Sequence, residues 1–296
     1  MSTDRPAFGR VRQCNLCAGR KVRPLYEMDG FHIVQCVACK LKYVAEELKP
    51  EQLNEYYGEP YYTGAQSKGY ADYIGSRDSR KRHFRSLIPT LKRHLNVGSP
   101  HVLDVGCAAG FFLEVAHEEG WEAQGIELSS FAAEYARSRL GLKVFTGTLA
   151  EAAFPPESFD LITLWDVIEH VPDPLAVLTE ARRVLRRDGL VVLSTGDISG
   201  ATASIYGRRW RLLAPPGHLF YFSRRTLFAL LRQTGFEVLQ WQSDGAFLLN
   251  GDDGEAEGGS GWQLPSFVVA LHHNRWVNAM LRRMKLGSVI TVYARG

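Results

Sequence analysis

Short apolar segments alternate with amphipathic ones from residue 101 onwards. The apolar segments predict buried strands, and the segments between them have apolar positions at helical spacing. The predicted helices begin at polar caps such as Ser129 or Ser130 and end before glycines, and one covers 174–187. Strands are predicted at 101–106, 122–128, 142–147, 159–165, 189–195, 236–241 and 288–294. Strands that alternate with helices across short loops predict an α/β fold with a doubly wound sheet, here the domain 99–296.

The region before this pattern, residues 46–98, is first aromatic and then basic. Its tyrosines are Tyr56, Tyr57, Tyr61, Tyr62, Tyr70 and Tyr73. Residues 77–95 predict a basic helix that ends near 96–98. We interpret this region as a linker with a lid helix. Its tyrosines either line a substrate mouth or pack the lid helix against the next domain.

Two segments interrupt the alternation of strands and helices. Residues 196–222 form a long connection after the fifth predicted strand and carry Arg208, Arg209 and Arg211. Long loops at the carboxyl edge of such sheets shape substrate sites, so we expect a substrate loop here. Residues 248–262 are rich in glycine and acidic residues, which predicts a flexible insertion.

Charge is distributed unevenly along the 296 residues, although the net charge is only +3. Lys and Arg outnumber Asp and Glu in residues 1–100 and 201–296, whereas acidic residues dominate 101–200. An anionic partner near the basic flanks would explain this pattern, and so would an ordinary solvated surface. The composition, 45% hydrophobic and 23% charged, excludes a fully disordered, collagenous or coiled-coil chain.

Four of the five cysteines lie in the first 40 residues, as Cys14-x2-Cys17 and Cys36-x2-Cys39. Four thiolates in two such pairs can close a tetrahedral shell around Zn²⁺, which is a structural geometry. Disulfides are the alternative, but the first residues lack the apolar core of an export signal. We therefore predict a small zinc ribbon over residues 1–45 and a cytoplasmic protein.

The residues that follow the first predicted strand indicate a cofactor site. The sequence from Val102 to Gly110 reads VLDVGCAAG, and small residues there let the backbone approach a ligand at a helix N-terminus. Glu127 ends the second predicted strand, where an acidic side chain accepts hydrogen bonds from ribose hydroxyls. The frame G-x-A-x-G fails the nicotinamide fingerprint G-x-G-x-x-G. Together these features predict a different adenosine-bearing cofactor.

From about residue 80 onwards, the chain resembles class I S-adenosylmethionine-dependent methyltransferases. The resemblance rests on Asp104, Gly106, Ala108 and Gly110 and on the segments 125–129, 158–174 and 186–195. It implies a Rossmann-like sheet of seven strands, one of them late and antiparallel. The chain departs from the family at Ala108, which replaces a glycine, and at Thr148, where an Asp often contacts the adenine. The cofactor residues it implies are Asp104, Gly106, Cys107, Gly110, Phe111, Glu127, Leu128, Thr148, Leu149, Trp165 and Asp166.

Two histidines are candidate catalytic residues. His170 follows the fourth predicted strand and His218 lies in the substrate loop, and either can act as a general base if the acceptor is a hydroxyl. The run D-x-x-E-H resembles the E-x-x-E-H of ubiquinone-type O-methyltransferases. That resemblance implies a divalent metal at Asp166, Glu169 and His170; alternatively, these residues support the pocket wall.

The acceptor class is predicted from the combination of modules. A four-cysteine ribbon before this core resembles bacterial sugar methyltransferases, whose zinc module is longer. We expect O-methylation of a sugar, nucleotide sugar or related small molecule, with Arg208, Arg209 and Arg211 as ligands of a phosphate group. An RNA methyltransferase whose ribbon recognises RNA, and a non-catalytic S-adenosylmethionine-binding scaffold, are the alternatives. No apolar run is long enough to predict membrane insertion, and no feature indicates an oligomeric state.

Overall fold

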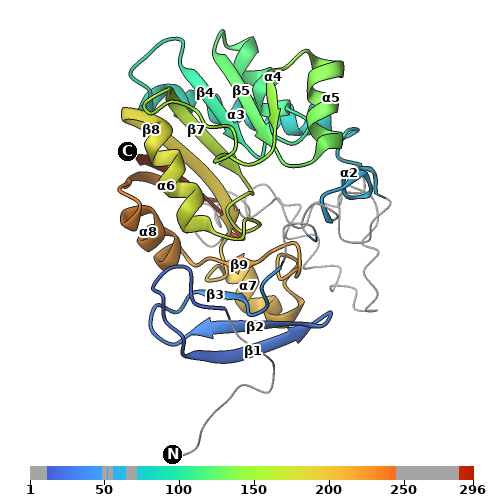
Figure 1. Ribbon diagram of the computed structural model, residues 1–296, viewed down its shortest axis with the longest axis vertical. Coiled ribbons are helices and arrows are strands. Elements are labelled where there is room, and N and C mark those ends of the chain that lie inside the picture. Colours follow the sequence, from blue (N-terminus) through green and yellow to red (C-terminus); the bar gives the residue numbers. More distant parts are fainter. Residues whose placement is uncertain (1–11, 49–51, 53–55, 65–71, 245–286) are drawn as a thin grey trace, which may run out of the picture.

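The computed structural model describes residues 12–48, 52, 56–64, 72–244 and 287–296 (Figure 1). Its centre is a seven-stranded sheet with the strand order β10-β11-β8-β7-β4-β5-β6. The antiparallel strand β11 lies between β10 and β8, and the ladders from β8 to β6 are parallel. The Rossmann-like sheet with one late antiparallel strand is therefore confirmed. The strands are β4 (His101–Val105), β5 (Glu122–Glu127), β6 (Val144–Thr146), β7 (Phe159–Trp165), β8 (Leu185–Gly196), β10 (Glu237–Asp244) and β11 (Val289–Arg295).

Helices cover both faces of this sheet, which is why its central strands are apolar on both sides (Figure 1). One face packs against α3 (Arg77–His94), α4 (Phe111–Glu118) and α5 (Ser130–Leu140). The other packs against α6 (Pro174–Val184) and α8 (Arg224–Gln233). Side chains of Ser129, Asp173 and Ser223 cap the N-termini of α5, α6 and α8 by accepting backbone N–H groups.

The predicted helix over 174–187 is too long, because α6 ends at Val184. Leu185 is fully buried and already pairs with Phe159 of β7 as the first residue of β8. The ladder shifts register before it resumes at Leu190, and Asp188 lies between with φ +59°. Burial of Leu185 against the sheet therefore starts the strand before the turn at residues 186–189.

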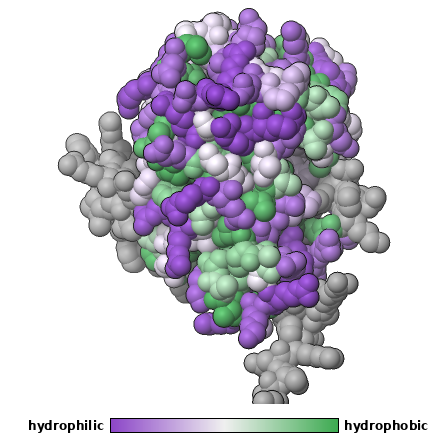
Figure 2. All heavy atoms as spheres, turned by 60° about the vertical axis from the view of Figure 1, so that its left-hand side comes forward, coloured by the Kyte–Doolittle hydropathy of each residue, from purple (hydrophilic) through white to green (hydrophobic). Residues whose placement is uncertain are grey.

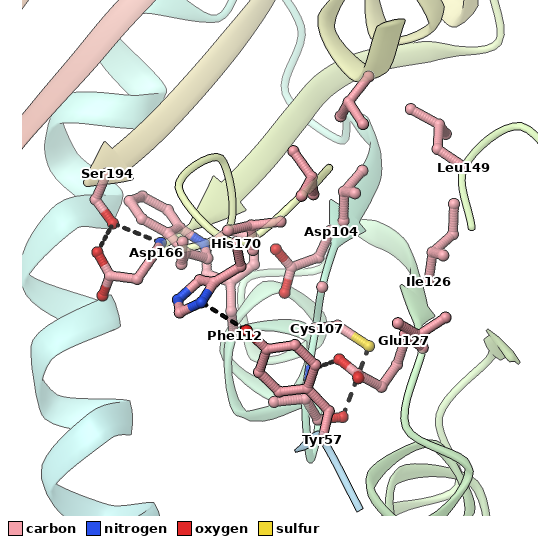
Figure 3. A pocket seen from close by; sticks show the side chains of 18 of the residues that line it. Tyr57, Asp104, Cys107, Phe112, Ile126, Glu127, Leu149, Asp166, His170 and Ser194 are labelled. Carbon is pink, nitrogen blue, oxygen red and sulfur yellow. Dashed lines mark hydrogen bonds between the residues drawn. The ribbon is translucent and has the colours of Figure 1, made fainter. Parts of the chain in front are cut away.

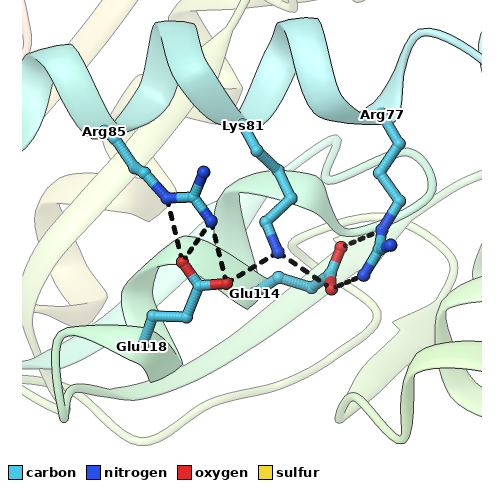
Figure 4. Close-up of polar contacts among 5 residues, drawn as sticks. All are labelled: Arg77, Lys81, Arg85, Glu114 and Glu118. Carbon is cyan, nitrogen blue, oxygen red and sulfur yellow. Dashed lines mark hydrogen bonds and ion pairs between the residues drawn. The ribbon is translucent and has the colours of Figure 1, made fainter.

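Basic side chains of α3 bind acidic side chains of α4, as Figure 4 shows. Arg77 pairs with Glu114, and Lys81 lies between the two carboxylates, 3.2 Å from Glu114 and 2.7 Å from Glu118. Arg85 completes the set at 2.8 Å from Glu118. Much of the basic charge before residue 100 thus neutralises acidic charge after it, which is a physical reason for the uneven charge pattern.

The N-terminal ribbon contains a second, four-stranded sheet in the order β1-β2-β3-β9. Its first three strands are β1 (Val22–Met28), β2 (Phe31–Cys36) and β3 (Lys42–Val44). The fourth, β9 (Phe220–Tyr221), comes from the segment 196–222, which also contains α7 (Ala201–Tyr206) and the short 3-10 helix η1 (Gly207–Arg209). The expected substrate loop therefore supplies an edge strand to the ribbon (Figure 1).

The two sheets share one hydrophobic core. Leu16, Tyr43 and Phe220 of the ribbon sheet belong to the same buried cluster as Leu178 of α6 and Leu227 of α8. The short helix α2 (Glu59–Thr63) carries tyrosines over the other side of the molecule, next to α5. The predicted insertion at 248–262 lies outside the described residues.

The surface drawn in Figure 2 is mostly hydrophilic, and apolar residues appear on it as separate areas. Among the described residues, the large exposed hydrophobic side chains are Val37, Val97, Leu128, Phe145, Ile205 and Leu239. In the part of the chain that the structure describes, no helix combines the length and the apolar character that a membrane span requires.

Candidate functional site

A cavity of about 290 Å³ opens at the carboxyl ends of β4, β5 and β7 (Figure 3). This edge is where open α/β sheets bind ligands, because the loops there diverge to opposite faces. The cavity is lined by backbone and side chains of these strand ends, by α3 and by the tyrosines around α2. Its walls are mainly apolar and aromatic, with a few polar groups, as in most small-molecule sites.

The turn from β4 into α4 forms the floor of the cavity. Gly106 has φ +71°, and a Cβ there would lie 2.5 Å from Cγ2 of Val167. The amides of Gly106 and Cys107 donate to the carbonyl of Ile126 at 2.8 and 3.0 Å, which fixes the turn against β5. A side chain at position 106 would fill the space that a ligand needs.

Glu127 ends β5 with its carboxylate buried at the cavity wall (Figure 3). It accepts the amide hydrogens of Ala108 and Ser129, both at 2.8 Å, and the hydroxyl of Tyr62 donates to it at 3.4 Å. Burial raises the pKa of Glu127, and these hydrogen bonds oppose the shift. The carboxylate is therefore held in one orientation by the same turn that carries Gly106.

Asp104 lies beside Glu127 and accepts a hydrogen bond of 2.6 Å from the Thr163 hydroxyl. Burial raises the pKa of Asp104 to about 8, with a smaller contribution from the charge of Glu127. Two neighbouring buried carboxyl groups thus resist carrying two charges, and a polar or cationic ligand group would relieve the repulsion.

Most of the predicted cofactor residues line this cavity. Asp104, Gly106, Cys107, Glu127, Leu128, Thr148, Leu149, Trp165 and Asp166 do so. Gly110 and Phe111 lie outside its lining among the described residues. A Cβ at Gly110 would meet Leu142 at 2.4 Å, so this glycine serves close packing of α4 against the chain after α5. Phe111 stacks on Tyr73, with 5.4 Å between ring centroids.

Tyrosines form the wall opposite the strand ends. Tyr57, Tyr61, Tyr62 and Tyr73 all line the cavity and contact one another edge to face, for example Tyr57 and Tyr61 with centroids 5.0 Å apart. The sequence left open whether they line a substrate mouth or pack a lid, and the structure places them in both roles. Arg80 and His83 of α3 add the basic groups of the lining.

His170 also faces the cavity, and its Nδ1 lies 2.7 Å from the hydroxyl of Tyr57 and 2.8 Å from the carbonyl of Gly217 (Figure 3). A carbonyl only accepts, so Nδ1 is assigned the proton and Nε2 is left as the basic nitrogen. Burial lowers the pKa of His170, although the Gly217 carbonyl opposes the shift. The ring is therefore neutral near pH 7.

His218 lies next to His170 but outside the lining of the cavity among the described residues. The two rings are perpendicular, with centroids 4.6 Å apart, and Nδ1 of His218 lies 2.8 Å from the carbonyl of Leu212. Burial and the neighbouring His170 lower the pKa of His218 to about 3. This environment supports the ring of His170 and gives His218 no contact with a cavity ligand.

The predicted metal trio of Asp166, Glu169 and His170 is not the one that the structure brings together. Ligand atoms of Glu169, His170 and His218 lie within 4.8 Å of one another. Asp166 is outside this group, because its carboxylate accepts the hydroxyl of Ser194 at 2.7 Å (Figure 3). Oε2 of Glu169 is buried without a hydrogen-bond partner among the described residues, and burial raises the pKa of this carboxyl to about 8. The corrected trio is a neutral buried group that could accept a cation or a proton.

The four ribbon cysteines converge as the sequence predicts. Their sulfur atoms lie within 4.8 Å of one another, with Cys14 to Cys39 and Cys17 to Cys36 both at 3.5 Å. A tetrahedral zinc site with Zn–S bonds of about 2.3 Å has sulfurs about 3.8 Å apart. The donor set and its spacing therefore fit zinc.

The arginines expected to bind phosphate lie with the ribbon instead. Arg208 donates to the carbonyl of Glu27 in β1 at 2.7 Å. Neither it nor Arg209 or Arg211 lines the described cavity, because η1 turns this segment towards the ribbon sheet. Arg80, from the other side of the cavity, is the arginine of the lining, and local sequence gave no reason to prefer it.

Residues 69–241 match the model of a family described as a methyltransferase domain. The Azoarcus sp. (strain BH72) ubiquinone biosynthesis O-methyltransferase is 36% identical over 108 residues, which cover 34% of this chain and 46% of that protein. The Methylococcus capsulatus enzyme of the same name is 28% identical over 173 residues, 55% of this chain and 70% of its own length. For the first two relatives, the match spans only about half of their length, 46% and 48%.

Solved structures share the fold. A SAM-dependent methyltransferase from Archaeoglobus fulgidus superimposes with a TM-score of 0.54 at 19% identity, over 80% of this chain and all of that one. One from Mesorhizobium loti gives 0.50 at 21% identity, over 71% of this chain and 98% of that one. At these identities the likeness concerns the fold alone.

Proposed function

The chain belongs to the methyltransferase domain family, and we propose that it transfers the methyl group of S-adenosylmethionine to a hydroxyl of a small-molecule acceptor. The observation that carries the proposal is that one cavity joins two devices. One is the turn at Gly106 with the carboxylate of Glu127, and the other is the His170 ring held by Tyr57. The first fits a nucleoside, and the second fits a proton-accepting step.

The cofactor end is formed by β4 and β5. Glu127 would accept the ribose hydroxyls, and the backbone at Gly106 leaves room for the ligand because position 106 lacks a Cβ. S-adenosylmethionine supplies a methyl group that is already activated on a positively charged sulfur. The protein therefore contributes mainly alignment and exclusion of water, and alignment contributes on the order of 7–11 kcal/mol to lowering a barrier.

His170 is the proposed general base. Its Nε2 is the basic nitrogen, and its lowered pKa keeps that nitrogen unprotonated near neutral pH. It would take the proton from the acceptor hydroxyl as the oxygen attacks the methyl carbon. Tyr57 and the Gly217 carbonyl hold the ring from the Nδ1 side, so the imidazolium that forms stays in place. A base of this kind contributes typically ~10²–10⁴-fold to a rate.

The walls of the cavity support an acceptor with a ring. Tyr57 and Tyr61 offer aromatic faces for a sugar or planar ring, and Arg80 offers a cation for an acidic group such as phosphate. We propose a sugar or nucleotide sugar as the first acceptor class. A phenol is the second candidate, favoured by the aromatic wall and by the named activity of the ubiquinone relatives.

An RNA acceptor is less well supported. The basic residues of α3, among them Arg77, Lys81 and Arg85, are bound to acidic residues of α4 and do not form a continuous track for phosphates. We also propose that the four ribbon cysteines hold a structural zinc ion, which would close a tetrahedral shell and stabilise the ribbon.

Binding and transfer assays test the proposal in two steps. Titration calorimetry with S-adenosylhomocysteine should give a saturable signal with the wild-type protein and none with Gly106→Arg. Labelled S-adenosylmethionine should then transfer its methyl group to members of a panel of nucleotide sugars, free sugars and phenols, but not to total RNA. Binding without transfer to any fraction of a cell extract would support the scaffold alternative and reject the enzyme proposal.

A further inference from the structure

We propose that the N-terminal ribbon is a wall-forming part of the methyltransferase unit and that Asn15 is a positioning residue for His170. The inference rests on the proposed function only in naming His170 as the base. Its structural content is a set of hydrogen bonds between the ribbon and the two segments that carry His170 and His218.

The first contact is made by Asn15, which lies between Cys14 and Cys17 in the first cysteine turn. Its Nδ2 donates to Oδ1 of Asp173 at 2.8 Å, and its Oδ1 accepts the amide of Leu175 at 3.1 Å. Asp173 is the N-cap of α6, and the Leu175 amide is one of the N-terminal donors that the helix itself leaves unpaired. Both ends of the Asn15 amide thus hold the start of α6, three residues after His170.

The second contact is the β3–β9 ladder. Tyr43 pairs with Phe220, and the amide of Val44 donates to the carbonyl of Leu219 at 2.9 Å. From the other edge of the same strand, the amides of Leu219 and Phe220 donate to the carbonyl of Glu169 at 2.8 and 3.1 Å. One short segment therefore bridges the ribbon sheet and the turn that carries His170.

The residues immediately before this segment are those that hold the His170 ring. Gly217 supplies the carbonyl that accepts from Nδ1, and His218 packs against the ring. A shift of the segment away from β3 would therefore move both supports of His170 together.

Arg12 closes the contact between ribbon and segment. Its guanidinium donates to the Leu219 carbonyl at 3.3 Å and lies 4.3 Å above the ring of Phe220. Because this arginine is largely buried, it acts as part of the packing and not as a free surface charge. The continuous apolar core around Tyr43 and Phe220 adds to the same attachment.

These contacts lie on one side of the cavity. They reach residues 169, 173–175 and 219–221, whereas the cofactor end consists of the turn at Gly106 and the end of β5. The geometry therefore predicts that a loosened ribbon disturbs His170 and leaves the affinity for the cofactor almost unchanged. A ribbon that served as a separate recognition module would leave both unchanged.

The test uses Asn15→Ala in the full chain, with Gln35→Ala as a matched control. Gln35 also makes one amide hydrogen bond in the ribbon, but its acceptor is the carbonyl of Lys40 within the ribbon itself. Metal analysis and calorimetry with S-adenosylhomocysteine check that each variant keeps zinc and binds the cofactor product. Amide hydrogen exchange of residues 167–175 and 217–222, and ¹⁵N histidine NMR signals of His170, report the acceptor side.

We expect exchange in both segments to rise about fivefold to tenfold in Asn15→Ala, the effect of losing an ordinary hydrogen bond. The NMR signals of His170 should shift as well, whereas Gln35→Ala should change neither. Unchanged exchange and unchanged His170 signals in a zinc-loaded Asn15→Ala protein would overturn the proposal.

A paired exchange of side chains guards against a variant that simply fails to fold. Asn15→Asp alone sets two carboxylates against each other, whereas Asn15→Asp with Asp173→Asn restores the bond with its polarity reversed and keeps a capping residue on α6. Recovery of wild-type exchange in the double variant supports the positioning role, and its absence contradicts it. Failure of the wild-type protein to bind S-adenosylhomocysteine would reject the proposed function and leave these exchange measurements valid.

Discussion

The hydroxyl of Tyr57 lies 2.7 Å from Nδ1 of His170, although the two residues are 113 positions apart in the chain. Their rings meet edge to face with centroids 5.7 Å apart. The Gly217 carbonyl accepts from the same two groups, at 3.1 Å from the hydroxyl and 2.8 Å from Nδ1. The pair thus joins the tyrosine region to the proposed base and fixes which ring nitrogen faces the reaction.

Removing this contact should affect transfer more than binding. We expect Tyr57→Phe to keep its affinity for S-adenosylhomocysteine and to lose about tenfold in kcat, because the ring of His170 loses one of its two Nδ1 partners. Steady-state kinetics with the identified acceptor measure this effect. A change in cofactor affinity alone would instead assign Tyr57 to the cofactor end of the cavity.

The pH dependence of transfer should reflect the lowered pKa of His170. The base is active when it is deprotonated, so kcat/KM should fall only when the pH drops through a value below the ordinary histidine pKa of about 6.5. It should be level from there to neutral pH. His170→Gln should remove this acidic limb along with most of the activity. A limb that persists in that variant would assign it to another group.

The turn at Gly106 offers a matched pair of glycine substitutions. Gly106 and Gly120 both have positive φ, +71° and +76°, but a Cβ at Gly120 meets nothing within 4 Å. Both alanine variants should lose about 1–2 kcal/mol of stability from backbone strain. We expect only Gly106→Ala to weaken S-adenosylhomocysteine binding, by at least about tenfold, because its Cβ displaces Val167. Equal affinities in calorimetry would show that the cavity floor lies elsewhere.

The ion pairs between α3 and α4 should stabilise the fold above acidic pH. Although burial opposes it, Arg77 and Lys81 hold the pKa of Glu114 below its ordinary value. A carboxylate with a lowered folded-state pKa stabilises above its unfolded value, about 4.3, and this stability is lost as the pH falls through the folded-state pKa. We expect Lys81→Ala to cost about 1–3 kcal/mol in urea unfolding at pH 7, because Lys81 is buried between two carboxylates. Arg82→Ala, at an exposed neighbouring position, is the control and should stay within about 0.5 kcal/mol.

Removal of zinc should unfold the ribbon first. Chelation, or Cys17→Ser, should release the metal and raise amide exchange in β1 to β3. Cys107→Ala removes the fifth cysteine, which belongs to the cavity and not to the cluster, and should keep a full zinc content. Metal analysis of the three proteins decides the point. A purified wild-type protein without zinc would contradict the zinc proposal.

The sequence by itself determined the elements whose signals are local. Burial on both faces makes a parallel strand a continuous apolar run, and 159–165 was predicted with the bounds that β7 has. The glycine turn at Gly106 and the acid at Glu127 were also legible, since a strand end and the next helix start fix them. The paired spacing of the four cysteines brought them together because each pair needs only one tight turn.

Tertiary structure decided the contacts between segments that are far apart in the chain. The two-residue strand β9 has no periodicity of its own and exists because β3 offers it an edge. The choice of His218 over Asp166 as a neighbour of Glu169 and His170 likewise depends on where the segment 196–222 returns to the sheet. Local patterns record which residues are buried or turn. They do not record which distant backbone or side chain satisfies a buried polar group, and that pairing fixes His170, Tyr57 and Asn15 in this protein.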